Sequence, residues 1–73
     1  MSKRRGLRTV RLNAEKVLSW RLKQQLSQRA AAEMCGIGQV TYRRIEHGKE
    51  ILTLCAHRVS ERLEIPLSKL IIN

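Results

Sequence analysis

The stretch LSQRAAAEMCGIGQVTYRRIEHGK, residues 26–49, decides the fold. It contains three consecutive alanines, two glycines one residue apart, a third glycine after a charged segment, and few bulky side chains. Two helices joined by a short turn cross at a steep angle, so their backbones come close. Ala32 supplies the small residue that such a crossing needs, and Gly36 supplies the left-handed residue that ends a helix. The apolar residues that would hold the second helix in place are Ile37, Tyr42 and Ile45.

Length and composition point in the same direction. The 73 residues suffice for one domain, near the lower size limit for an independent core. One Trp, one Tyr, no Phe and one Pro favour helices built from Leu, Ala and Ile over a sheet-based core. Fifteen basic residues stand against six acidic ones, giving a net charge of +9, so a polyanion is the first partner to consider.

Several classes of protein are not supported. No apolar run approaches the roughly 18 residues of a membrane span, so we expect no membrane partner and a cytoplasmic location. Two cysteines are too few for a disulfide framework. Nothing resembles a catalytic set, so we expect no enzyme and no cofactor. We also expect no metal site, because the spacing C-x11-H-x7-C-x-H is not that of a zinc finger. It involves Cys35, His47, Cys55 and His57.

The basic residues are unevenly distributed. Residues 1–13 hold five of them and no acidic residue, which predicts a basic N-terminal arm over 1–12 and a domain over 13–73. Thr9–Leu12 alternates polar and apolar residues and could lie extended against the domain as a short edge strand. The arm residues expected to contact DNA are Lys3, Arg4, Arg5 and Arg8. The alternative is a solvated tail.

Local signals divide the domain into five short helices. Asn13 and Ser27 are predicted N-caps, for helices that begin at residues 14 and 28. A third helix begins near Gly38 and ends at Gly48. Thr53 can cap a fourth helix that extends to residue 63, and 67–72 forms a short last one.

The exposed side of the third predicted helix carries one amide, two guanidinium groups and two methyl-bearing side chains. These are the groups that pair with base edges in the major groove and with phosphates. The residues are Gln39, Val40, Thr41, Arg43 and Arg44.

The chain resembles the lambda-repressor/Cro-like helix-turn-helix family, also called XRE. The resemblance is carried by LSQ at 26–28, Ala32, GIGQ at 36–39, RIEHGK at 44–49 and ERLEIPLSKLI at 61–71. It implies an all-α, compact five-helix domain with the helix-turn-helix at helices 2 and 3. It also implies binding to double-stranded DNA through the third helix, usually as a dimer.

The resemblance assigns further roles. Gln28 would contact a phosphate or brace Gln39, while its alternative is an exposed helix-starting residue. Gln39 itself would contact a base, or else only a phosphate or water. Arg21 and Glu46 would form a salt bridge under the third helix, or else be unrelated surface charges. The complete expected DNA-binding set is Gln28, Gly38, Gln39, Val40, Thr41, Arg43, Arg44 and Lys49. The departures from the family pattern are Ala31, His57 and Arg58, which stand where larger aliphatic residues are common.

The C-terminal segment is the expected dimer interface. A short last helix cannot bury apolar residues on all sides internally, so the surplus is a candidate two-fold patch. The dimer could be one that forms only on DNA. The alternative is that Ile71 and Ile72 fold back onto the fourth helix and the protein is a monomer in solution. The candidate residues are Leu67, Leu70, Ile71 and Ile72.

The predicted function is that of a small stand-alone, sequence-specific transcription regulator, a Cro-like or repressor-like protein of the kind found in phages and plasmids. Two alternatives remain open. One is an antitoxin or accessory protein that acts mainly through a protein partner. The other is a non-specific nucleic-acid binder that uses the basic arm.

Overall fold

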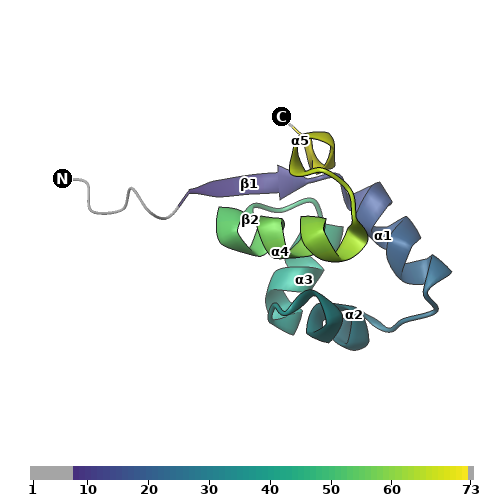
Figure 1. Ribbon diagram of the computed structural model, residues 1–73. Helices are drawn as coiled ribbons and strands as arrows, with labels where there is room; N and C mark the ends of the chain where they lie inside the picture. The colour runs from purple at the N-terminus through teal and green to yellow at the C-terminus, as the bar shows by residue number, and fades with distance from the viewer. Residues whose placement is uncertain (1–7, 73) are drawn as a thin grey trace.

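Helices dominate the structure, and one small sheet lies beside them (Figure 1). The computed structural model describes residues 8–72. Within this range the five expected helices are all present, which confirms the predicted five-helix fold. The small sheet is an addition to the all-α architecture that the sequence predicted. None of the helices in residues 8–72 is long and apolar enough to span a membrane. In chain order the elements are β1 (Thr9–Leu12), α1 (Ala14–Lys23), α2 (Gln28–Cys35), α3 (Gln39–Glu46), β2 (Ile51–Leu52), α4 (Thr53–Leu63), α5 (Leu67–Leu70) and β3 (Ile71–Ile72).

Local capping explains where the first helices begin and end. The side-chain oxygen of Asn13 accepts a hydrogen bond from the backbone N–H of Lys16 at 3.2 Å. The hydroxyl of Ser27 accepts from the backbone N–H of Ala30 at 3.0 Å. Gly36 closes α2 with φ of 74°, a left-handed conformation that favours glycine. These three predictions are confirmed.

Two predicted features of the C-terminal half are wrong. Thr53 does not cap α4, because it is the first residue of that helix and its hydroxyl donates to the carbonyl of Arg8 at 3.1 Å. The last helix ends at Leu70 and does not extend to residue 72. Ile71 and Ile72 are extended instead, because β1 offers them backbone hydrogen-bond partners.

The sheet ties both ends of the described chain to the helices. Its order is β2-β1-β3 with both pairings antiparallel, so β1 is the central strand and not an edge strand. Leu12 lies opposite Ile71 and is fully buried. Residues 9–12 are therefore packed as part of the domain, although they fall within the range 1–12 that the sequence assigned to the arm.

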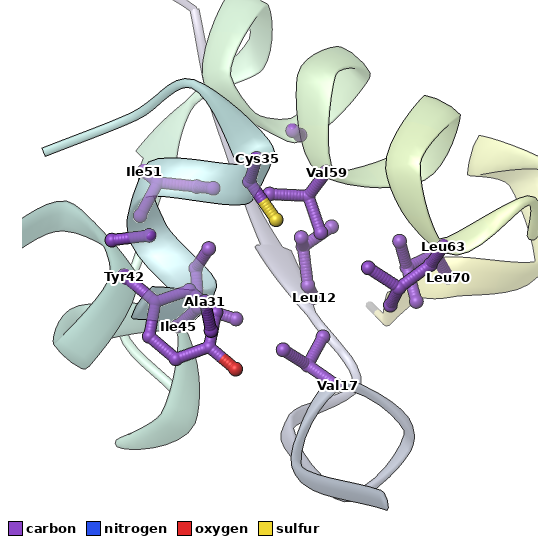
Figure 2. Close-up of a cluster of buried hydrophobic side chains, with 12 residues drawn as sticks. Leu12, Val17, Ala31, Cys35, Tyr42, Ile45, Ile51, Val59, Leu63 and Leu70 are labelled. Atoms are coloured by element: carbon purple, nitrogen blue, oxygen red, sulfur yellow. The ribbon is translucent and has the colours of Figure 1, made fainter. Parts of the chain in front are cut away.

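The core lies between β1 and the helices α1 to α5. Figure 2 shows Tyr42 and Ile45 of α3 close to Ala31 of α2, with Leu12 and Val17 nearer to the centre of the cluster. Ala31 is fully buried, so a small residue is accommodated at that position. The buried residues are Leu12, Val17, Ala31, Ala32, Cys35, Tyr42, Ile45, Ile51, Ala56, Val59, Leu63 and Leu70.

Candidate nucleic-acid interface

The helix α3 has one buried side and one exposed side. Tyr42 and Ile45 are fully buried against the rest of the core. Val40, in contrast, is 69% exposed although it is apolar. An exposed aliphatic side chain on a short helix is available for contact with a partner. The turn at Gly36 and the crossing of α2 and α3 thus present the other side of α3 to solvent.

We call the exposed residues of α3 and of its two flanks the recognition face. Thr41 is half-buried and lies at the border of this face. His47 is exposed and was not predicted, although its spacing of four from Arg43 and seven from Val40 places all three on one side of a helix. That periodicity was the signal that could have identified it. The members of the recognition face are Gly38, Gln39, Val40, Arg43, Arg44, His47 and Lys49.

The two arginines of the recognition face differ in what they contact. The guanidinium of Arg44 donates twice to the carbonyl oxygen of Glu50, at 3.2 and 3.0 Å. Within residues 8–72, no hydrogen bond or ion pair engages the side chain of Arg43. Both arginines line one shallow hollow, together with Val40, His47 and Lys49. Arg43 is therefore the more available guanidinium, while Arg44 holds the loop that follows α3.

Beneath the recognition face, one carboxylate joins three helices. Glu46 accepts hydrogen bonds from Arg21 of α1 at 2.7 and 3.1 Å. It also accepts one from the side-chain amide of Gln28 at 2.8 Å. The Arg21 and Glu46 side chains are 16% and 8% exposed, so the pair is largely buried. This is the pairing that the family resemblance implied, and Gln28 contacts Glu46 instead of bracing Gln39.

These contacts change the protonation of the groups involved. Burial by itself would raise the pKa of Glu46, but the hydrogen bonds from Arg21 and Gln28 outweigh burial and keep that pKa below its usual value. The hydrogen bond to Glu46 raises the pKa of Arg21. The Tyr42 hydroxyl is buried without a hydrogen-bond partner in residues 8–72, and burial and the nearby Glu46 carboxylate raise its pKa. The network is thus a charged, internally paired support for α3 at neutral pH.

Only one of the expected arm residues can be placed. Lys3, Arg4 and Arg5 lie outside the described residues. Arg8 is exposed, and its carbonyl accepts hydrogen bonds from the backbone N–H and the hydroxyl of Thr53 at 2.9 and 3.1 Å. The next residue, Thr9, donates to the carboxylate of Glu50 at 2.9 Å. The chain therefore enters the sheet beside the loop that follows α3.

The expected dimer residues do not form one exposed patch. Leu70 is fully buried in the core of its own chain, so it is not accessible to a partner, and its assignment to the interface is wrong. Leu67 and Ile71 are half-buried and pack against that core. Ile72 is 40% exposed and lies on β3, an edge strand of the sheet.

Comparison with protein families identifies the chain. The helix-turn-helix family model matches residues 17–54, which include α2, the turn and α3. Searches of curated proteins and of solved structures return no match. The matched segment contains both the recognition face and the Arg21–Glu46 pair. The chain therefore belongs to the XRE-type, lambda-repressor/Cro-like helix-turn-helix family of DNA-binding transcription regulators.

Proposed function

We propose that this protein is a sequence-specific transcription regulator of the Cro or repressor type. It binds an inverted-repeat operator as a homodimer, with α3 in the major groove. One observation carries the proposal: Tyr42 and Ile45 fix α3 by its buried side, while the recognition face on the other side stays open. A site that is held rigidly from below and exposed above suits contact with base edges.

The chemistry of the recognition face fits that role. The amide of Gln39 can pair with both the ring nitrogen and the exocyclic amine of adenine. The guanidinium of Arg43 can pair in the same two-point manner with guanine. The methyl groups of Val40 can contact the methyl of thymine. Lys49 and the arm would add phosphate contacts, which supply affinity but no sequence preference.

The proposed dimer follows from the small size of one recognition helix. One recognition helix covers only a few base pairs, so proteins of this type place two of them on successive turns of the duplex. Ile72 and the free edge of β3 supply a small apolar contact for a second copy. A contact of this size would give weak association, so the dimer would form mainly on DNA. A DNA partner also agrees with the expected cytoplasmic location.

The test is selection of bound sequences from a randomised duplex pool, followed by footprinting of the DNA upstream of the protein's own gene. We expect an inverted repeat whose half-sites lie about 34 Å apart, one turn of the duplex. Equal binding to every sequence with a steep salt dependence would instead identify a non-specific nucleic-acid binder. Absence of DNA binding together with a co-purifying acidic protein would identify an accessory factor or antitoxin.

A further inference from the structure

Two arginines of α4 contact the end of α2 from the side. Arg58 and Arg62 are four residues apart, so both lie on one face of α4. The Nη1 of Arg58 donates to the carbonyl oxygen of Gly36 at 3.0 Å. The Nε of Arg62 donates to the carbonyl oxygen of Met34 at 2.8 Å. Both acceptors are main-chain atoms at the point where α2 gives way to the turn.

These carbonyls are suitable acceptors for a positive charge. The last carbonyl groups of a helix have no partner within the helix, and the helix dipole adds negative charge at that end. The backbone N–H of Gly36 and of Ile37 already return to Glu33 and Ala32, at 3.1 Å each, which closes the last turn of α2. The two arginines then bind carbonyls that this closure leaves free.

The turn at residues 36–38 gains from such support because two of its three residues are glycines, whose backbone dihedral angles are weakly restricted. Gly36 and Gly38 stand on either side of Ile37. A Cβ at Gly38 would meet no atom within 4 Å, so no neighbouring side chain packs against that position. The direction of α3 depends on these three residues as well as on the burial of Tyr42 and Ile45. Arg58 fixes the carbonyl of Gly36 in the turn, and Arg62 fixes the carbonyl of Met34 just before it. These contacts from α4 therefore also restrain the direction in which α3 begins.

We propose that Arg58 and Arg62 are positioning residues for DNA recognition, which hold the turn between α2 and α3 so that the recognition face meets base edges in the correct orientation. This inference rests on the function proposed above. Both side chains line a hollow that also contains Glu61 and Glu64. Two carboxylates beside the arginines disfavour a DNA phosphate at this place. The arginines thus act through the turn and do not contact DNA.

The first experiment compares specific with non-specific binding. The double variant Arg58→Met/Arg62→Met removes both donors and keeps long side chains. Its affinity should be measured for the selected operator and for an unrelated duplex at several salt concentrations. We expect the ratio of operator affinity to unrelated-duplex affinity to fall about tenfold. This is comparable to the loss of one two-point contact between a side chain and a base. Affinity for the unrelated duplex and its salt slope should match those of Lys23→Ala/Lys69→Ala, which removes two exposed cations of α1 and α5 and is the control for two removed charges.

A variant with lysine at both positions separates the loss of the hydrogen-bond donors from other effects of the methionine substitutions. Arg58→Lys/Arg62→Lys keeps a charged donor at both positions and should recover most of the affinity ratio. Thermal unfolding of each variant shows whether the domain stays folded. Equal losses for both duplexes with a lower salt slope would mean that the arginines contact phosphates, which overturns the proposal. An unchanged affinity ratio in the folded double methionine variant overturns it as well.

Amide hydrogen exchange in the free protein tests the support of the turn independently of DNA. In the double methionine variant the amide of Ile37 should exchange several-fold faster, while core amides of α1 keep their rates. Unchanged exchange at Ile37 would show that the arginines do not hold the turn. If the wild-type protein binds every duplex equally, the proposed function fails, but this exchange measurement still decides whether the arginines fix the turn.

Discussion

Glu46 joins α1, α2 and α3 through one carboxylate, because Arg21 and Gln28 both donate to it. The family resemblance predicted the Arg21–Glu46 pair from residue identity. It did not predict that Gln28 would also bind Glu46. The resemblance assigned Gln28 to a phosphate or to Gln39, and the crossing of the helices places the Glu46 carboxylate 2.8 Å from the Gln28 amide instead. Such choices cannot be made from spacing along the chain.

The first prediction at this scale concerns the energy of the pair. Arg21→Ala or Glu46→Ala alone should lower the free energy of unfolding by about 3 kcal/mol, because each leaves a largely buried charge without its partner. The double variant should lose clearly less than the sum of the two single losses. Denaturant titration of the four proteins measures this. Costs that are near zero and additive would contradict the prediction.

The second prediction concerns how the contribution of Glu46 to folding stability depends on pH. The pKa of Glu46 is lower in the folded protein than the value near 4.3 expected for the unfolded chain. Its ionised form therefore stabilises the fold above that unfolded value, and the contribution is lost as the pH falls through the folded pKa. The stability difference between wild type and Glu46→Gln should be largest at neutral pH and shrink below about pH 4. A difference that stays constant down to pH 3 would show that the folded pKa is not lowered.

The third concerns base recognition. Gln39→Ala should weaken binding to the operator by roughly 1–3 kcal/mol and relax the preference at one base pair in each half-site. Gln24→Ala removes an exposed amide just after α1 and is the matched control. Sequence selection with each variant gives the base preference at every position. An unchanged preference profile for Gln39→Ala would remove Gln39 as a base-contacting residue.

At the scale of elements, the helices and the extended segment Thr9–Leu12 could be predicted, but the pairing of that segment with β2 and β3 could not. Asn13, Ser27 and Gly36 act on their own neighbours, so local sequence determines where α1 begins and where α2 begins and ends. The strand β3 has two residues, and its conformation depends on β1, some 60 positions away along the chain. The apolar pattern of residues 67–72 predicted a helix that extends through Ile72. No residue nearby in the sequence indicates that β1 pairs with Ile71 and Ile72.

The way in which β1 is anchored determines how the arm should be tested. Thr9 lies in a hollow that also includes Thr41 and Arg44, so the described chain begins beside α3. Deleting residues 2–7 removes Lys3, Arg4 and Arg5 and keeps the Arg8 carbonyl that binds Thr53. We expect lower affinity and a log affinity versus log salt slope that is shallower by about 0.9 for each phosphate that the truncated protein no longer neutralises.

Folding and charge are controlled separately in that experiment. Lys23→Ala removes a positive charge at a distance from β1 along the chain. Circular dichroism of the truncated protein shows whether β1 and the helices persist. Identical salt slopes for the full-length and truncated proteins would mean that the arm makes no phosphate contact.

At the scale of the whole molecule, the outer side of the sheet exposes two apolar side chains from its two edge strands. Leu12 and Val10 alternate with Thr9 and Arg11, so the second pair faces away from the core. Arg11 lies opposite Ile72 and Thr9 opposite Leu52, which places both apolar residues on that outer side. Ile72 and Leu52 are 40% and 43% exposed. A second copy is one partner that would cover them.

The last prediction tests that dimer. Ile72→Asp should weaken cooperative binding to the inverted repeat, because an acidic side chain at a two-fold contact meets its own copy and repels it. Binding to a single half-site should change little, since Ile72 is outside the recognition face, and the melting temperature should stay close to that of the wild type because the side chain is already partly exposed. Leu54→Asp, an exposed position at the start of α4, is the matched control for adding one negative charge to an apolar surface. Gel-shift titrations on one and two half-sites measure cooperativity directly. If a non-repeated site is occupied by one chain with full affinity, the two-fold contact does not exist, and α3 and the arm alone must account for recognition.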